Sequence, residues 1–247
     1  MRAVLSVAFW SYMAVSSTVL CLGAAILWLV TLPFDPTRRV LHRYSSMWAW
    51  HYIALWPWWR VTFYDRDKLP SGPAVIAANH QSFADILVLY GLFHHFKWVS
   101  KAAIFKVPVV GWNMRMNDYV RIERGNPQSA RRMMDQCARH LENGSSVLLF
   151  PEGTRSPDGQ LRPFKHGAFT LAVRAGVPIV PVAVVGTWEV LPKSGWVLRG
   201  NRVDAHVQVL DPIHPDEVGG DVQALQERTR DAIMAAQPAL RALRGER

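Results

Sequence analysis

The chain opens with a long apolar stretch. No charged residue occurs between Arg2 and Asp35, and about 20 apolar residues are enough to cross a bilayer as a helix. A cleaved signal peptide is the alternative, but its apolar region normally spans about 7–15 residues and ends at small side chains. This stretch is longer and ends in Leu32-Pro33-Phe34. We therefore expect a retained helix that anchors the protein to a membrane.

A second segment, at about residues 38–59, has large apolar side chains at helical spacing. Tyr44, Trp48 and Tyr52 recur on one face, and three arginines crowd the start of the segment. Tryptophan prefers the membrane interface, so we expect this helix to lie in the plane of the lipid headgroups. A core helix of the soluble domain is the alternative. A single crossing and a helical hairpin in one leaflet are both compatible with the two segments.

From about residue 60, short apolar runs alternate with helical patterns. Four runs predict strands, at residues 74–78, 147–150, 177–185 and 203–209. This order of elements predicts an α/β fold with a mostly buried central sheet flanked by helices. We divide the chain into membrane-anchoring helices, residues 1–59, and an α/β domain, residues 60–247. We expect much of that domain to keep its fold when residues 1–34 are removed.

Capping residues mark the predicted helices of this domain. Ser82 can cap a helix that follows the first strand. Asn126 and Pro127 begin a helix over residues 126–143, with an apolar stripe formed by Ala130, Met133, Met134, Cys137 and Leu141. The last predicted helix covers about residues 222–236, and we expect Pro238 to end the fold.

Composition narrows the classes of partner. A formal net charge of +9 suggests nucleic acid, an anionic membrane surface or a phosphorylated substrate. Seven of the eleven tryptophans lie in the first 60 residues, which favours a membrane and a lipid over nucleic acid. The two cysteines, Cys21 and Cys137, form no metal-ligand spacing and no disulfide pattern, as is typical of proteins in reducing compartments.

The first candidate site follows the strand predicted at residues 74–78 and reads Asn79-His80-Gln81-Ser82-Phe83-Ala84-Asp85. Residues five apart do not share a helix face. His80 and Asp85 can therefore meet only if His80 precedes the helix and Asp85 lies in its first turn. The carboxylate would then orient the imidazole and leave the other ring nitrogen as a general base. A surface pair or a capping aspartate is the alternative.

A second candidate site follows the next buried strand and reads Phe150-Pro151-Glu152-Gly153-Thr154-Arg155-Ser156. Its Pro and Gly predict a turn at the end of the strand, where α/β sheets usually bind ligands. Arg155 can hold a phosphate through two hydrogen bonds. Glu152 is acidic, so it is suited to brace a loop or to orient a substrate hydroxyl. An ordinary turn with a solvated arginine is the alternative.

Basic residues gather between the two candidate sites. From Lys97 to Arg132 there are eight Lys or Arg and only two acids. Arg124 stands just before the helix over residues 126–143, whereas Arg131 and Arg132 suit a solvated helix face. The stretch therefore combines candidate anion ligands with ordinary surface charge.

Four segments occur in order and at plausible spacing, namely Asn79 to Asp85, Ile122-Glu123-Arg124, Phe150 to Ser156 and Val177 to Val182. Together they resemble the four blocks of the glycerolipid acyltransferase family, in particular the bacterial 1-acylglycerol-3-phosphate acyltransferases. The resemblance covers roughly residues 60–190 and implies an α/β core with an N-terminal helical pair on the membrane. The last block has no ionisable group, and we interpret it as a buried strand, with one wall available to line an acyl channel.

The resemblance also implies roles for individual residues. His80 would be the general base and Asp85 its partner, while Arg124 and Arg155, helped by Lys101, would bind the acceptor phosphate. The substrate-binding residues are then Lys101, Arg124, Glu152, Gly153, Thr154 and Arg155. One departure is minor: the second block usually has Asp before its arginine, where this chain has Glu123.

The implied activity is transfer of a fatty acyl chain from acyl-CoA or acyl-ACP to the free sn-2 hydroxyl of 1-acylglycerol-3-phosphate. The product would be phosphatidic acid for phospholipid synthesis. We expect no metal and no cofactor besides the acyl thioester co-substrate. The expected partners are a lysophospholipid acceptor, membrane lipid and, as one candidate donor, acyl carrier protein, but no nucleic acid. The alternatives are another lysophospholipid or lyso-lipid acceptor, and a non-catalytic protein that binds anionic lipid.

Arginines also predict where the protein resides. Arg38, Arg39 and Arg43 follow the first apolar segment, and basic residues after a membrane helix favour the cytoplasmic side. We therefore expect the cell inner membrane, with the active domain on its cytoplasmic side.

Overall fold

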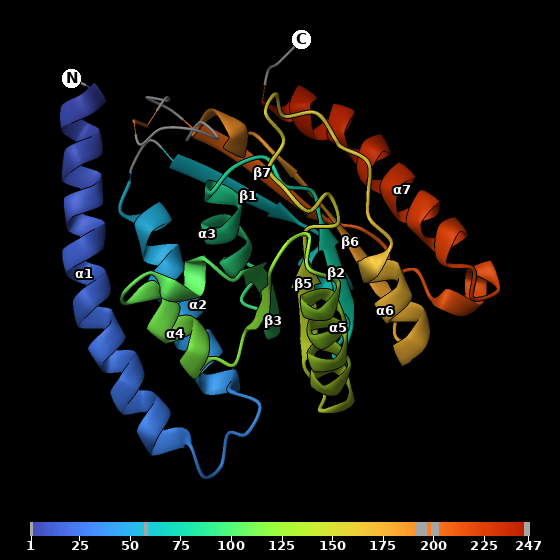
Figure 1. The fold of residues 1–247 in the computed structure, drawn as a ribbon. Coiled ribbons are helices and arrows are strands. Elements are labelled where there is room, and N and C mark those ends of the chain that lie inside the picture. Colours follow the sequence, from blue (N-terminus) through green and yellow to red (C-terminus); the bar gives the residue numbers. More distant parts are fainter. Residues whose placement is uncertain (1, 57–58, 191–196, 199–202, 245–247) are drawn as a thin grey trace.

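We describe residues 2–56, 59–190, 197–198 and 203–244 of a computed structural model of the chain. The helices are α1 (Arg2–Thr31), α2 (Arg39–Ala54), α3 (Ala84–Tyr90), α4 (Val110–Met116), α5 (Pro127–Glu142), α6 (Gly167–Ala175) and α7 (Val222–Leu243). The strands are β1 (Trp59–Tyr64), β2 (Val75–Ala78), β3 (Phe96–Lys101), β4 (Val120–Ile122), β5 (Ser146–Leu149), β6 (Ile179–Val185) and β7 (Val203–Val209). The predicted α/β fold is confirmed (Figure 1).

The seven strands form one sheet in the order β1-β7-β6-β2-β5-β3-β4. The five strands from β6 to β4 run parallel, whereas β7 pairs antiparallel with β6 and β1 runs parallel to β7. Loops that leave the carboxyl ends of β2, β5 and β3 therefore meet at one edge of the sheet.

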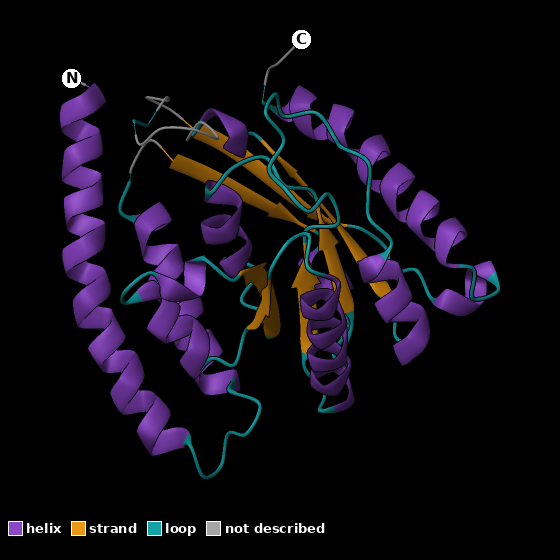
Figure 2. Cartoon of the chain, in the orientation of Figure 1, coloured by secondary structure: helices purple, strands orange, loops and turns teal. Residues whose placement is uncertain are grey.

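Both faces of the sheet are covered by helices, as Figure 2 shows. In β2, Ile76 and Ala78 join a core with α1, α2, α3 and α4, whereas Val75 and Ala77 join a core with α5, α6 and α7. Because side chains alternate along a strand, a strand buried on both faces is apolar at nearly every position. This explains the uninterrupted apolar runs at β2, β5 and β6.

The N-terminal helix α1 has a buried side and an exposed side. Phe9, Cys21 and Ala24 are buried in the core, and α1 lies beside α2 and α4 (Figure 1). Its other side exposes apolar side chains, among them Val4, Val7, Val15, Val19, Leu22, Ile26 and Leu29. By length and composition, α1 is the one helix in the described part of the chain that is suited to cross a membrane.

The aromatic stripe of α2 faces the interior of the protein and not the lipid headgroups. Trp48, Tyr52 and Ile53 are buried, and the helix packs against α1 and α3. The aromatic stripe is therefore part of the hydrophobic core, as in the alternative of a core helix. Residues 57–58 of the predicted segment lie outside the described residues, and the division at residue 59 remains an interpretation of the sequence.

Two predicted helix boundaries also differ from the structure. The helix after β2 begins at Ala84, its N-cap position is Phe83 and no side chain caps it, so Ser82 is not the N-cap. Helix α7 continues through Pro238 to Leu243. Proline removes one helical N–H, but the buried side chain of Leu240 holds the last turns against the core. The start of α5 is as predicted, with Asn126 accepting the N–H of Ser129.

Candidate active site

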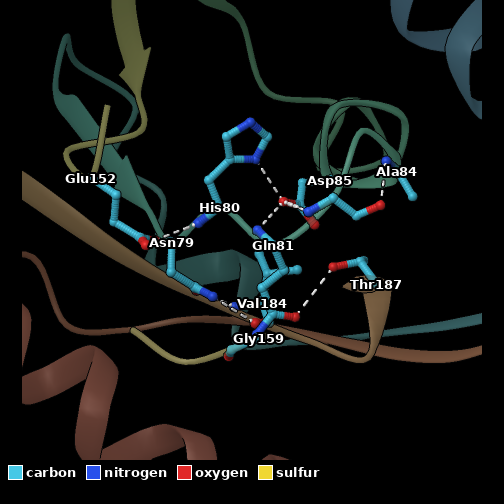
Figure 3. A network of polar contacts seen from close by, with 10 residues as sticks. Asn79, His80, Gln81, Ala84, Asp85, Glu152, Gly159, Val184 and Thr187 are labelled. Carbon is cyan, nitrogen blue, oxygen red and sulfur yellow. Dashed lines mark hydrogen bonds and ion pairs between the residues drawn. The ribbon is translucent and has the colours of Figure 1, made fainter. Parts of the chain in front are cut away.

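His80 lies just beyond the carboxyl end of β2, and its side chain contacts Asp85 in the first turn of α3. The His80 Nδ1 and Asp85 Oδ2 atoms are 2.7 Å apart, as Figure 3 shows. The predicted meeting of these two residues is confirmed. Because Nδ1 is engaged, Nε2 is the ring nitrogen that remains for other contacts.

Asp85 also organises the backbone between itself and His80. Its Oδ2 atom accepts the N–H of Gln81 at 2.6 Å and of Ser82 at 2.8 Å. Asp85 is completely buried, and hydrogen bonds of this kind offset part of the cost of burying a carboxylate. The same oxygen therefore shapes the loop and orients the imidazole.

Glu152 braces the loop from behind. Its Oε1 accepts the backbone N–H of His80 at 2.7 Å, and its Oε2 accepts the N–H of Arg162 at 3.1 Å. The backbone N–H of Ser156 in turn donates to the His80 carbonyl at 2.8 Å. Burial raises the pKa of the Glu152 carboxyl to about 7. Of the two uses predicted for Glu152, the geometry supports the brace.

Two residues with unassigned roles also fix this site. The His80 ring stacks on Phe150, with centroids 3.9 Å apart and an interplanar angle of 12°. The Asn79 amide exchanges two hydrogen bonds with the backbone of Val184, at 2.8 and 2.7 Å. Asn79 and Phe150 belong to the two segments that the sequence marked as candidate sites. Their contacts with Val184 and His80 were not predictable, because these partners are distant in the sequence.

His80 borders a cavity of about 690 Å³. The interior is mostly apolar and is lined by side chains from α1, α2, α3 and α4, among them Met13, Trp48, Leu87 and Met114. Strand β6 is absent from the cavity walls among the described residues. The suggestion that the run Val177 to Val182 lines an acyl channel is therefore wrong, because both faces of β6 are buried against the two cores.

Four cationic side chains line the same cavity, namely Lys101, Arg124, Arg155 and Lys165. Lys101, Arg124 and Lys165 are exposed, so they mark where the cavity reaches the surface. The cavity thus combines a basic mouth with an apolar interior, and His80 lies on its wall.

The predicted site residues occupy two positions relative to this cavity. Six line it, namely His80, Lys101, Arg124, Gly153, Thr154 and Arg155. Asp85 and Glu152 lie behind the wall and act on His80 through hydrogen bonds. Lys165 was not among the predicted site residues, and it approaches Gly153 from the loop before α6. Gly153 has φ +69°, and a Cβ there would lie 3.0 Å from the Lys165 ammonium nitrogen.

Other members of the basic stretch have separate roles. Lys97 is buried, and its ammonium group donates to the carbonyls of Thr37 and Asn117 at 2.7 and 2.8 Å. Burial lowers the pKa of Lys97 to about 8. Arg131 and Arg132 are exposed on α5, as predicted. Among the described residues, no three His, Cys, Asp or Glu side chains are placed to hold a metal ion.

Residues 60–185 match the model of a protein family described as Acyltransferase. This chain belongs to the acyltransferase family. The match spans β1 to β6 and contains both loops that carry the candidate site.

Relatives within the acyltransferase family are similar over most of this chain. The chloroplastic 1-acyl-sn-glycerol-3-phosphate acyltransferase LPAT1 of Arabidopsis thaliana is 40% identical over 81% of this chain and 56% of its own length. The lyso-ornithine lipid O-acyltransferase of Pseudomonas aeruginosa is 32% identical over 68% of this chain and 69% of its own length. The chain spans a little over half the length of the plant and algal relatives that it matches.

One solved acyltransferase has the same fold. The crystal structure of the 1-acyl-sn-glycerophosphate acyltransferase PlsC from Thermotoga maritima superposes with a TM-score of 0.76 and 23% sequence identity. The superposition covers 96% of this chain and 98% of that one. At this identity, the likeness establishes the fold of this acyltransferase and nothing finer.

Proposed function

We propose that this protein transfers a fatty acyl chain from an acyl thioester to the free sn-2 hydroxyl of 1-acylglycerol-3-phosphate, and so produces phosphatidic acid. One observation carries the proposal: a His80–Asp85 pair borders a cavity with a basic mouth and an apolar interior. A lysophosphatidic acid molecule has the matching halves, a dianionic headgroup and a hydrocarbon chain. The names of several relatives agree with this assignment.

The proposed reaction begins at the free ring nitrogen of His80. Nε2 takes the proton of the acceptor hydroxyl while that oxygen bonds to the thioester carbonyl carbon. Asp85 stabilises the resulting imidazolium through Nδ1. When the tetrahedral intermediate collapses, the carbon–sulfur bond breaks and the imidazolium returns its proton to the departing thiol. The step uses no metal and no cofactor besides the thioester.

The cationic residues give the acceptor its orientation. A phosphate held by Arg124, Arg155, Lys101 and Lys165 would be fixed at the mouth, because guanidinium and ammonium groups form strong charge-assisted hydrogen bonds with phosphate oxygens. Gly153 and Thr154 belong to the same wall, where a backbone without bulky side chains admits the headgroup. Coenzyme A and acyl carrier protein are both compatible with this arrangement as carriers of the donor.

A second acceptor is favoured by one specific observation. The lyso-ornithine lipid O-acyltransferase of Pseudomonas aeruginosa matches this chain over two thirds of its own length. A lyso-ornithine lipid carries an amine and a carboxylate in place of a phosphate. Four cations around one mouth suit a phosphate dianion better, so we rank this acceptor second.

We further propose that α1 attaches the enzyme to the cell inner membrane, with the α/β domain on the cytoplasmic side. The exposed side of α1 is apolar along its length, and lipid is the natural solvent for such a surface. Arg38, Arg39 and Arg43 follow α1 and favour the cytoplasmic side. Because α1 packs lengthwise on α2 and α4, immersion in one leaflet fits this geometry better than a crossing.

The test is an acceptor and donor panel with purified protein. Wild-type protein is expected to form phosphatidic acid from lysophosphatidic acid and acyl-CoA or acyl-ACP, and His80→Ala to lower the rate by about 10²–10⁴-fold. His214→Ala, an exposed histidine outside the cavity, is the matched control. Full activity in a well-folded His80→Ala protein would overturn the mechanism. A higher specificity constant for lyso-ornithine lipid would overturn the assigned acceptor.

A further inference from the structure

The connection between β3 and α4 exposes apolar side chains beside the cavity. It contains a short 3₁₀ helix, Ile104–Lys106, and the start of α4. Ile104 is 40% exposed, Val107 43%, Val110 42% and Trp112 53%. Four large apolar side chains in nine residues form an unusual surface for a protein in water, and such patches mark sites of contact with a partner or a membrane.

This surface continues the exposed face of α1. Helix α1 packs on α4, and the Cys21 thiol lies 3.6 Å from the Val109 carbonyl oxygen. Val19 and Leu22, which flank Cys21 along α1, point outward with more than half of their surface exposed. Figure 1 shows α4 lying beside α1 on the same side of the sheet. Exposed apolar side chains of both segments therefore flank the contact between α1 and α4.

The same connection forms part of the cavity wall. Ile104 and Val110 line the cavity while remaining partly exposed, and Lys101 lies next to them on that wall. The apolar surface thus reaches the mouth of the cavity. Lys106 and Arg115 are exposed at its border, where cations suit anionic headgroups.

The backbone of this connection is held in a tight conformation. Val109 has φ +66°, a region that β-branched residues rarely adopt, and the N–H of Val110 donates to the Pro108 carbonyl at 2.7 Å. A Cβ at Gly111 would clash with the Phe105 carbonyl oxygen, so the turn packs closely on the 3₁₀ helix. Strained backbone of this kind persists where the surrounding structure enforces it. Val109 lies between the partly exposed side chains of Val107 and Val110.

We propose that residues 104–112 form a second membrane-inserting element, which enters the same leaflet as α1 and immerses the mouth of the cavity in lipid. The inference rests on the proposed function, because a lipid acceptor needs a path from the bilayer to His80. An acceptor can then slide into the cavity along Ile104 and Val110 without passing through water. Tryptophan with flanking lysine and arginine is typical of interfacial segments.

The first test measures insertion without turnover. Both native cysteines are buried, so a cysteine introduced as Val107→Cys can be labelled with the polarity-sensitive fluorophore NBD. Vesicles of phosphatidylcholine and phosphatidylglycerol are expected to shift its emission to the blue, and brominated lipids are expected to quench it. The matched control is Met234→Cys, which is 46% exposed on α7, on the far side of the molecule from α1 (Figure 1). A position-107 label that stays in water would overturn the proposal.

The second test measures delivery of the acceptor. A Val107→Asp/Trp112→Asp variant is expected to lower the rate on lysophosphatidic acid in vesicles by about tenfold or more, because charge opposes insertion. The rate in detergent micelles should stay within about twofold, as for most surface substitutions. Met234→Asp should change neither. Equal losses in vesicles and micelles would overturn the proposal. If wild-type protein does not acylate this acceptor at all, the proposed function fails while the fluorescence test still decides insertion.

Discussion

The Glu152 carboxylate accepts the backbone N–H of His80 at 2.7 Å and so ties the loop after β5 to the loop after β2. The two loops lie 72 residues apart in the chain. They meet because β2 and β5 are parallel neighbours in the sheet. The buried Glu152 carboxylate therefore fixes the backbone of His80. The buried Asp85 carboxylate orients the ring of the same histidine.

Replacing Asp85 with Asn should remove most of the activity and leave the fold. The amide oxygen can still accept the N–H groups of Gln81 and Ser82, but the side chain loses the charge that stabilises imidazolium. We expect kcat to fall by about 10²–10⁴-fold with little change in the KM for lysophosphatidic acid. Asp221→Asn is the control, since Asp221 accepts the N–H of Gln223 at the start of α7 and does not line the cavity. Unchanged kcat in Asp85→Asn would show that the aspartate only shapes the loop.

Replacing Glu152 with Gln should change how stability depends on pH. Burial raises the pKa of Glu152 from 4.5 to about 7. Between these values the folded protein keeps a proton that the unfolded chain releases, so the free energy of unfolding falls as pH rises. The expected loss is on the order of a few kcal/mol over this interval, and the Gln variant lacks it.

Urea unfolding in detergent from pH 4.5 to 8 checks this prediction. The stability advantage of the wild type over Glu152→Gln should shrink as pH rises through about 7. An advantage that grows with pH would mean that the two backbone N–H groups hold the carboxylate charged.

Removing either arginine at the mouth should weaken the acceptor's binding. Arg124→Ala and Arg155→Ala are each expected to raise the KM for lysophosphatidic acid by about 10–100-fold, the equivalent of one charge-assisted hydrogen bond. The KM for the thioester should change much less. Arg131→Ala is the matched control, because Arg131 is exposed on α5 and does not line the cavity. A rise in the donor's KM instead would assign these arginines to the coenzyme or carrier protein.

Deleting residues 2–31 should destabilise the whole protein, contrary to the expectation that the α/β domain would keep much of its fold. Phe9, Cys21 and Ala24 are buried in the core, and Met13 and Ser17 line the cavity. Their loss should cost on the order of several kcal/mol and abolish activity even in micelles. Thermal unfolding and micelle assays measure both effects.

A double substitution on the exposed side of α1 separates anchoring from folding. Leu22→Ser/Ile26→Ser changes side chains that face outward, so the melting temperature in detergent should stay near that of the wild type. Binding to vesicles should weaken, because about 0.8 kcal/mol is lost for each methylene group withdrawn from lipid. If the variant that lacks residues 2–31 were soluble and fully active, α1 would be a separable anchor and not part of the core.

Local patterns determined much of this protein. Strands buried on both faces are apolar at nearly every position, so β2, β5 and β6 were predictable from short runs of sequence. Capping chemistry is also local, and Asn126 and Pro127 marked the start of α5 correctly. The spacing of His80 and Asp85 was informative because both belong to one loop and one helical turn.

Tertiary structure decided what distant segments do to one another. Aromatic spacing in α2 is the same for a core helix and an interfacial helix, and only the packing of α1 and α3 against it made Trp48 a core residue. Lys165 had no signal because its position beside Gly153 depends on how the chain returns after β5. The hydrogen bond from His80 to Glu152 likewise depends on strand order, because β2 and β5 are neighbours in the sheet but distant in the sequence. The position of Ile104 at the mouth of the cavity also depends on the tertiary structure.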